Sequence, residues 1–478
     1  MVFASTEFLV FFLPIALALY FVVPRKLKNA SLLFSSLIFY SWGEPVYVVL
    51  MCFSIMLNYV SGLFFAKVKN KGWRNVILFI SVAINLGMLG VFKYANLFVD
   101  GFNSITGLAV TSPSLVLPIG ISFYTFQAMS YTIDVYRGDV EVQYNPVDFG
   151  AFVTMFPQLI AGPIVRYSDV ARELAKREIN MTLFGQGTRR FILGLGKKVL
   201  LANTVAVLWN SIQDIFRANG GELPAALAWV GILAFALQIY FDFSGYSDMG
   251  IGMGKMLGFN FPENFNYPYV SRSISEFWRR WHMTLGTWFR DYVYFPMGGS
   301  RVNSKFRLVF NLMVVWLLTG FWHGAAWNFL LWGVYFGVLI SIEKLFLGKW
   351  LEAIPGVFGK VVSWTYCFVL VVIGWVMFNF LDFAEVIAYL KSMFGLAGQP
   401  FYNNDFLRIF STNWRLLLVL IVAAVPWWHK VLGNQKVARL SVKPVGIILS
   451  SGYYLLILIV SIAYLVANTY NPFIYFRF

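Results

Sequence analysis

The chain has 478 residues, of which 59% are hydrophobic, 19% aromatic and only 12% charged. So few charged side chains cannot cover a water-soluble globule of this length, and the composition therefore excludes a soluble protein and predicts a polytopic membrane protein. The formal net charge of +15 would suit nucleic-acid binding, but the lysines and arginines lie in short clusters between apolar segments, as in cytoplasmic loops. We therefore expect membrane lipids, and no nucleic acid, around the chain.

Thirteen apolar segments approach the length of about 20 residues that a helix needs to cross a bilayer. They lie at 8–23, 31–43, 46–66, 75–92, 114–135, 147–165, 185–209, 224–242, 306–324, 327–345, 360–380, 411–428 and 444–466. The segments 31–43 and 147–165 are short or interrupted by Pro157 and Gly162-Pro163, and are candidates for re-entrant helices. We expect an all-α protein with about eleven to thirteen crossings, in one membrane domain over residues 1–478.

Basic clusters predict the orientation of these helices. The first apolar segment precedes the basic residues at 25–28 and has no small-residue cleavage site, so we expect it to be retained as a first span with the N-terminus outside. The basic cluster at 67–74 can share the cytoplasmic side if residues 31–66 form a hairpin that turns at Glu44-Pro45. Basic residues within 436–443 then place the C-terminus outside as well.

Polar residues interrupt the apolar segment that begins at residue 224. Asp242 lies between two phenylalanines at membrane depth, where a carboxylate is expected to pair with an arginine or to cap a broken helix. The glycine-rich stretch 252–258 lacks the spacing of a phosphate-binding loop. Cys52 and Cys367 lie in apolar segments and indicate neither a disulfide nor a metal site. We expect no bound metal and no resident cofactor.

The segment 270–305 is too charged to cross a membrane and is rich in aromatic residues. At helical spacing its apolar stripe comprises Phe277, Trp278, Trp281, His282, Leu285, Trp288 and Phe289, with Arg279, Arg280 and Arg290 mostly beside it. Ser273 or Ser275 can cap the start of this helix. The pattern predicts an interfacial amphipathic helix, with aromatic rings among lipid headgroups and arginines near lipid phosphates. His282 lies on the apolar side, where such a helix needs no histidine.

A second unusual histidine, His323, lies inside Leu308–Ile342, which contains thirty-five residues and no Asp, Glu, Lys or Arg. An ionisable side chain at membrane depth is costly and usually marks a functional site, although a neutral histidine bound to a backbone carbonyl is the alternative interpretation. Imidazole titrates near neutrality, which suits proton transfer. We interpret His282 and His323 as candidates for one site, whereas His429 ends a span beside a basic loop and belongs to an interfacial belt.

Two motifs carry a resemblance to a known family. The stretch Ser275-Glu-Phe-Trp-Arg-Arg-Trp-His-Met-Thr-Leu285 is followed by Gly320-Phe-Trp-His-Gly-Ala-Ala-Trp-Asn-Phe-Leu-Leu-Trp-Gly333, whose His323 lies forty-one residues after His282. This order resembles the signature of the membrane-bound O-acyltransferases, and more narrowly the bacterial branch with the alginate O-acetylase, the peptidoglycan O-acetyltransferases and the teichoic acid D-alanyl transfer protein. Further matches extend the resemblance over nearly the whole chain, at 118–127, 156–163, 240–248 and 472–478.

The resemblance implies a ring of helices around a deep funnel, with His323 as the essential histidine at its narrow base and His282 as a second polar residue. It also implies a multi-pass enzyme of the bacterial cytoplasmic membrane. Such an enzyme passes an acetyl group from a cytoplasmic thioester, acetyl-CoA or an acyl carrier, to an extracytoplasmic hydroxyl. A separate extracytoplasmic, esterase-like partner would then modify a polysaccharide.

Each histidine is expected to have a defined role in this chemistry. A neutral imidazole can take the proton of a hydroxyl that attacks a thioester, so we interpret His323 as the general base. We interpret His282 as the group that orients acceptor or donor, or that stabilises the developing charge. Further candidates are Trp281, Trp322, Trp327, Asn328 and Asp242 around the pocket, and Arg279 and Arg280 on donor phosphates or lipid phosphates.

Two alternatives stay open. The first is D-alanyl transfer from a carrier protein to teichoic acid, although the motif at 277–285 looks more like the acetylase type. The second is a polysaccharide or lipid-linked transporter without acyl transfer, which broken helices and midplane polar residues also suit. Transport, however, offers no reason for two histidines among tryptophans. The depth of His323 depends on whether Gly320 and Gly324 break its helix.

Overall fold

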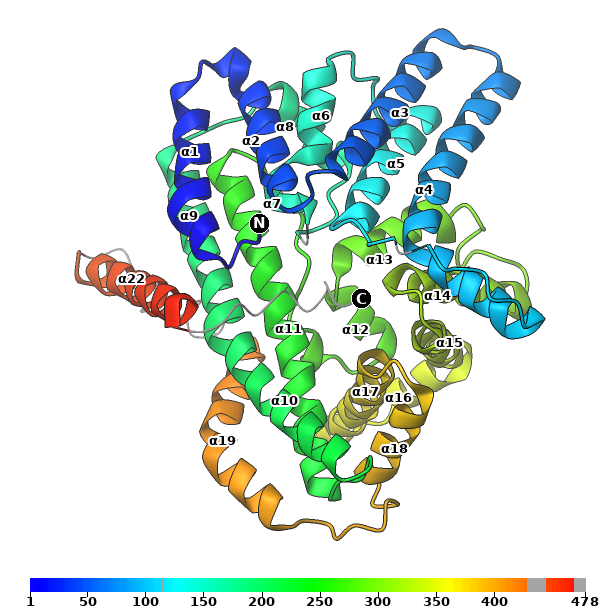
Figure 1. The fold of residues 1–478 in the computed structure, drawn as a ribbon, viewed down its shortest axis with the longest axis vertical. Helices are drawn as coiled ribbons and strands as arrows, with labels where there is room; N and C mark the ends of the chain where they lie inside the picture. The colour runs from blue at the N-terminus through cyan, green and yellow to red at the C-terminus, as the bar shows by residue number, and fades with distance from the viewer. Residues whose placement is uncertain (114, 161, 428–443, 468–478) are drawn as a thin grey trace. The chain divides into compact units, whose positions relative to one another are not determined.

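The computed structural model of the protein describes residues 1–113, 115–160, 162–427 and 444–467 (Figure 1). Every regular element in these ranges is helical, which confirms the all-α class. His429, the basic residues within 436–443 and the terminal match at 472–478 lie outside the described residues.

Nine helices in the described ranges are long and apolar enough to cross a membrane. They are Val48–Lys67, Lys71–Thr106, Met181–Ala218, Ala225–Met256, Lys305–His323, Trp327–Ala353, Gly356–Asn379, Asn404–Ala423 and Pro444–Ala467. All thirteen predicted segments overlap helices, but the helical stretches at 8–22, 28–43, 121–137 and 146–159 are too short to count among the nine. The multi-pass helical class is therefore confirmed, with fewer full-length spans than the sequence predicts.

Contacts group the chain into two compact units, and each is described by itself. Unit 1 is built mainly from Met1–Gly194 and Tyr246–Glu263, and unit 2 mainly from Leu195–Gly245 and from the described part of Asn264–Tyr464. The helices that begin in unit 1 are η1 Phe8–Phe12, α1 Leu13–Val22, η2 Arg25–Leu27, α2 Lys28–Gly43, α3 Val48–Lys67, α4 Lys71–Thr106, α5 Ile121–Arg137, α6 Pro146–Thr154, α7 Phe156–Leu159, α8 Tyr167–Ala175 and α9 Met181–Gly196.

Two local predictions in unit 1 are confirmed. Helix α2 ends at Gly43 and α3 begins at Val48, so the chain turns at Glu44-Pro45. The segment 147–165 breaks at Met155, which is not helical (φ −44°, ψ 110°) and precedes Pro157 in the first turn of α7. Proline has no N–H to donate and its ring clashes with the preceding turn, so a helix tolerates it only near its start.

A buried amide pair holds α3, α4 and α5 together inside unit 1. Asn58 Nδ2 donates to Asn85 Oδ1 at 3.1 Å, and Asn85 Nδ2 donates back to Asn58 Oδ1 at 3.2 Å. Thr132 Oγ1 on α5 also donates to Asn58 Oδ1, at 2.7 Å. Both asparagines are fully buried, so this interhelical network satisfies polar groups that lipid could not.

Unit 2 contains the remaining helices. They are η3 Lys197–Ala202, α10 Asn203–Ala218, α11 Ala225–Met256 (whose last turns belong to unit 1), η4 Pro268–Val270, α12 Ile274–Arg280, α13 Met283–Phe289, η5 Arg290–Tyr294, α14 Lys305–His323, α15 Trp327–Ile342, η6 Glu343–Leu347, α16 Gly348–Ala353, α17 Gly356–Asn379, α18 Phe383–Met393, α19 Asn404–Ala423 and α22 Pro444–Ala467.

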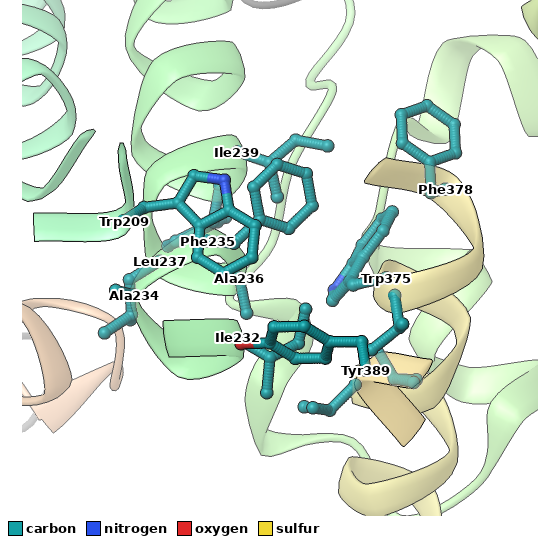
Figure 2. Packing of buried hydrophobic residues seen from close by; sticks show 14 of the residues in the cluster. Trp209, Ile232, Ala234, Phe235, Ala236, Leu237, Ile239, Trp375, Phe378 and Tyr389 are labelled. Carbon is teal, nitrogen blue, oxygen red and sulfur yellow. The ribbon is translucent and has the colours of Figure 1, made fainter. Parts of the chain in front are cut away.

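The core of unit 2 is a continuous cluster of large aromatic and aliphatic side chains from α10, α11, α12, α14, α15, α17 and α18. Figure 2 shows Trp375 and Phe378 projecting from the same helix, with Trp209 on another segment. Tyr389 is also fully buried, and its hydroxyl donates to the carbonyl of Ala228 at 2.8 Å. Such close packing of large buried rings gives a rigid frame for the side chains beside them.

Helices α14 and α15 form a hairpin with a close backbone contact. A Cβ atom at Gly320 would collide with the carbonyl oxygen of Phe329, and one at Gly333 would collide with the carbonyl oxygen of Trp316. Only glycine permits this approach, which is a common device for packing membrane helices. The end of α14 is therefore held firmly against the start of α15.

The predicted interfacial helix over 270–305 is not one helix. It is divided into α12 and α13, which are seven residues each, and His282 lies between them with φ +45° and ψ 53°. A residue in the left-handed region cannot continue a right-handed helix, so the helical spacing is lost there. Most of the predicted apolar stripe is buried in the protein, namely Phe277, Trp281, His282, Leu285, Trp288 and Phe289.

Candidate active site

His323 is the last residue of α14, and the following Gly324 is extended. Gly320 does not interrupt the helix, so Gly324 is the break. The His323 side chain is 5% exposed. Its ring contacts Trp322, Trp332 and Phe378 at centroid distances of 4.9, 5.0 and 5.3 Å, each near perpendicular. Such edge-to-face contacts on three sides fix the orientation of the imidazole.

His282 is held in the link between α12 and α13 and is 2% exposed. Its ring contacts Phe243 of α11 at 4.7 Å and Trp322 at 5.9 Å between centroids. Its Nδ1 lies 3.0 Å from Oδ1 of Asn264. The link thus receives contacts from two helices and from the segment that follows α11.

The hydrogen bonds of Asn264 determine the tautomer of His282. The backbone N–H of Thr284 can only donate, and it lies 3.3 Å from the same Asn264 atom, which must therefore be the amide oxygen. Thr284 Oγ1 also donates to this oxygen, at 2.9 Å. Because an amide oxygen only accepts, Nδ1 of His282 carries the proton and the lone pair is on Nε2.

Burial also keeps His282 neutral. The residue lies outside the candidate membrane spans, and burial lowers the pKa of its imidazole from 6.5 to about 3. Desolvation disfavours the charged form of a base, so the ring is unprotonated at Nε2 at any physiological pH. His282 can therefore accept a hydrogen bond or a proton at Nε2.

The structure brings the two histidines to the same tryptophan. Trp322 contacts both imidazole rings and is itself 5% exposed. Trp281, next to His282, packs into the core at 4.8 Å from Trp375 and 5.1 Å from Phe265. The histidines thus lie at one edge of the aromatic core, although their roles stay a prediction at this point.

The other predicted pocket residues are divided between buried and exposed positions. Asn328 is 3% exposed, and its Nδ2 donates to the carbonyl of Met377 at 3.1 Å, which ties α15 to α17. Trp327 is 70% exposed and does not join the aromatic cluster around His323. Arg279 is exposed, whereas Arg280 is partly buried and pairs with Glu276, with 2.9 Å between Nε and Oε1.

Asp242 is paired, but with a lysine instead of the expected arginine. Its Oδ1 lies 2.6 Å from Nζ of Lys198, and both side chains are at most 4% exposed. Helix α11 continues unbroken to Met256, so Asp242 does not cap a helix end. The pair stabilises α11 against η3 one residue before Phe243, which contacts His282. Asp242 therefore helps to fix the part of α11 that carries Phe243, whose ring contacts His282.

Glu343, at the start of η6, anchors the beginning of α12. Its carboxylate accepts from the backbone N–H groups of Ile274 and Ser275 at 2.6 and 2.9 Å, and from Ser275 Oγ at 2.8 Å. Of the two predicted caps, Ser273 is the one that accepts from Glu276 N, at 3.0 Å, while Ser275 is a donor to Glu343. The N–H groups of a helix's first turn have no partner within the helix, so the buried carboxylate that accepts from them is a charge-assisted cap.

Several site residues escape sequence reasoning. Trp332 belongs to the motif Gly320–Gly333, and its helical spacing from Asn328 along α15 is the sequence signal for it. Phe243 and Phe378 look like any other phenylalanine in an apolar helix. Asn264 follows α11 in an irregular segment and carries no pattern, yet it is 1% exposed and bonded to His282.

Comparisons with known proteins identify the family of this chain. The sequence model of the membrane-bound O-acyltransferase family matches residues 139–381, which include both histidines. The chain is 38% identical to the probable alginate O-acetylase AlgI of Pseudomonas putida, over 100% of both chains. It is 32% identical to the peptidoglycan O-acetyltransferase of Helicobacter pylori, over 83% of this chain and 80% of that one. It is 28% identical to the teichoic acid D-alanyltransferase of Lacticaseibacillus rhamnosus, over 62% and 73%. The chain belongs to the membrane-bound O-acyltransferase family.

Proposed function

We propose that this O-acyltransferase moves an acetyl group from a cytoplasmic thioester, acetyl-CoA, across the membrane to a hydroxyl of an extracytoplasmic partner protein or polysaccharide. The observation that carries the proposal is the pair of buried histidines against one tryptophan, His282 and His323 against Trp322. Relatives named as O-acetylases support the acetyl group, since two of them match most of this chain.

His323 acts as the general base in this proposal. A hydroxyl is a poor nucleophile near neutral pH, so its proton must leave as its oxygen attacks the thioester carbonyl. The imidazole takes that proton, the new C–O ester bond forms, the C–S bond breaks, and the thiolate leaves and is protonated. General-base assistance of this kind contributes about 10²- to 10⁴-fold. Three ring contacts hold the imidazole in one orientation, which such proton transfer requires.

His282 orients a substrate through an N–H or O–H group other than the reacting hydroxyl, because that hydroxyl has one proton and His323 takes it. Nε2 of His282 carries a lone pair, because Nδ1 donates to Asn264, and burial keeps the ring neutral. A nitrogen of this kind accepts a hydrogen bond and has no proton to donate to a developing oxyanion. Of the roles considered for His282, orientation of a substrate is therefore favoured over stabilisation of negative charge.

The setting of the reaction is the bacterial cytoplasmic membrane, with both termini extracytoplasmic. A separate extracytoplasmic, esterase-like protein receives the acetyl group and passes it to the polysaccharide. The exposed Arg279 suits the phosphates of the donor or of lipids, whereas Arg280 pairs with Glu276. The enzyme uses the donor thioester as substrate and needs no resident cofactor.

D-alanyl transfer from a carrier protein is the second candidate within the family. It has the support of the D-alanyltransferase relatives, but these are 28% identical over at most 62% of this chain, against 38% over all of it for an O-acetylase. Acetyl transfer is therefore the better supported reaction.

Reconstitution tests the proposal. The full chain, in liposomes with external [¹⁴C]acetyl-CoA, should transfer label to an acceptor hydroxyl that is present on the other side. His323→Ala should abolish this transfer and His282→Ala should reduce it strongly. His429→Ala is the matched histidine control, because its sequence context predicts an interfacial position, and it should keep wild-type transfer.

Three outcomes would count against the proposal. Full transfer by His323→Ala contradicts the assignment of the base. Label that crosses only as intact acetyl-CoA supports a transporter, and transfer only from a D-alanyl carrier thioester supports the second candidate. The product must be identified as an ester by mass spectrometry, because hydrolysis of the donor also releases label.

A further inference from the structure

The segment that follows α11 is bonded to both sides of His282. The backbone N–H of Asn266 donates to the carbonyl of Arg280 at 2.9 Å, and the backbone N–H of Met283 donates to the carbonyl of Asn264 at 2.9 Å. The Asn264 side chain bonds His282 and Thr284 from the same position. We call these contacts of Asn264, through its amide oxygen and its carbonyl, the Asn264 clamp.

The clamp explains how a histidine stays in the left-handed region. Among the non-glycine residues of the described chain, only Tyr267 and His282 have a positive φ, and both have φ +45°. Residues with a side chain rarely adopt this backbone conformation, and it persists only where several surrounding contacts hold it in place. Here Asn264 bonds three consecutive residues, which are His282, Met283 and Thr284.

We propose that Asn264 is a positioning residue of the acyl transfer, whose amide oxygen holds His282 in the Nδ1–H tautomer so that Nε2 accepts a hydrogen bond from a substrate N–H or O–H group other than the reacting hydroxyl. This inference rests on the proposed function, and it adds a residue outside both family motifs. A partner on one ring nitrogen determines which nitrogen can act, and the partner's loss typically costs about 10- to 100-fold in activity where it supports a metal ligand.

The charged groups near His282 form ion pairs with one another, and the group that holds Nδ1 of His282 is a neutral amide. On α12, Arg280 pairs with Glu276, and on α11, Asp242 pairs with Lys198 one residue before Phe243. Burial alone accounts for the lowered pKa of His282. An aspartate at 264 would therefore introduce a carboxylate directly onto Nδ1. Opposite charge favours the imidazolium, so the pKa of His282 would rise.

Two variants separate the clamp from simple packing. Asn264→Ala removes the acceptor, frees the tautomer, and should lower kcat by about 10- to 100-fold with little change in the KM for acetyl-CoA. Asn264→Asp keeps the shape and the Nδ1–H tautomer of neutral His282, but it raises the pKa. Acetyl transfer by Asn264→Asp should be slow at low pH and should recover as the pH rises above the new pKa of His282. The acidic limb of its pH–rate profile should therefore be shifted to higher pH than in wild type.

Thr284→Val and NMR supply the controls. Thr284→Val removes one hydroxyl donor but keeps the backbone N–H on Asn264 Oδ1, and it should stay within about threefold of wild type. The chain has only three histidines, so ¹⁵N-histidine NMR of the full protein can assign His282 by its loss in His282→Ala. Wild type should give a protonated Nδ1 and an unprotonated Nε2, and Asn264→Ala should give a mixture of tautomers.

The outcomes distinguish this inference from the proposed function. Wild-type kcat in Asn264→Ala, or an Nε2–H tautomer in the wild-type spectrum, would overturn the role of Asn264. If the spectra are as expected but His282→Ala transfers at the wild-type rate, the clamp holds the tautomer while the proposed role of His282 fails. An Asn264→Asp profile that matches wild type would also contradict the inference. Folding of each variant is checked by its elution as a monodisperse peak in detergent.

Discussion

The two histidines are held in different ways. His323 ends a regular helix and is oriented by rings, with Trp322, Trp332 and Phe378 around it. His282 lies in a left-handed link and, besides its ring contacts with Phe243 and Trp322, is oriented by a hydrogen bond between Nδ1 and Asn264. Ring contacts fix the plane of an imidazole, whereas a hydrogen bond fixes which nitrogen carries the proton. The difference teaches that the two residues suit different tasks, a base at a defined angle and an acceptor of defined tautomer.

The two histidines both contact Trp322, and its loss should have the largest effect of the substitutions outside the two histidines. Trp322→Ala removes a ring contact from both imidazoles, so we expect transfer to fall by about 10²-fold, as for other losses of active-site alignment. Trp322→Phe keeps an aromatic ring and should retain more activity. The measurement is kcat for acetyl transfer in liposomes. Equal activities for the two variants would contradict an orienting role of this ring.

Substitution of Glu343 tests the hydrogen bonds that hold α12, the helix that precedes His282. Glu343→Ala leaves the first N–H groups of α12 without their carboxylate, which should lower the free energy of unfolding by about 1–3 kcal/mol. The loss is measured as a lower Tm in detergent. Ser275→Ala removes only one of the three bonds and should lower Tm less. An unchanged Tm in Glu343→Ala would show that this cap does not stabilise the fold.

The pH dependence of stability sharpens the description of His282. Its pKa is about 3 when folded, below the ordinary 6.5. The unfolded chain therefore binds one more proton between these values, and stability falls as the pH is lowered through this window. His282→Gln removes this contribution, which is on the order of 2 kcal/mol between pH 6.5 and 5. Tm measured at several pH values should fall less steeply in the variant, and equal slopes would contradict a buried neutral histidine.

Trp327 should have the smallest effect. It belongs to the same motif as Trp322, but it is 70% exposed and outside the ring contacts of His323. Trp327→Ala should therefore keep transfer within about twofold of wild type, as is usual for surface positions. A loss as large as that of Trp322→Ala would mean that this exposed ring contacts a substrate or partner.

Helices were predictable from the sequence because apolar length is a direct physical requirement of the bilayer. That His282 and His323 lie near each other could be expected, since His323 is costly at membrane depth and an interfacial helix needs no histidine on its apolar side. The break at His282 was not predictable, because its conformation depends on bonds from Asn264, eighteen residues earlier. The partner of Asp242 was missed for the same reason, since Lys198 meets it only when η3 packs on α11. Trp322 and Trp327 differ only because the helix ends between them.

The glycine contact between α14 and α15 has a mechanical consequence. Backbone atoms meet directly at Gly320 and Gly333, so neither helix can slide along the other without separating the hairpin. His323 is one turn beyond Gly320 and moves only as the hairpin moves. In the proposed acyl transfer, His323 would therefore keep its position, and both substrates would have to move to it. Even one added methyl group at Gly320 should therefore displace His323.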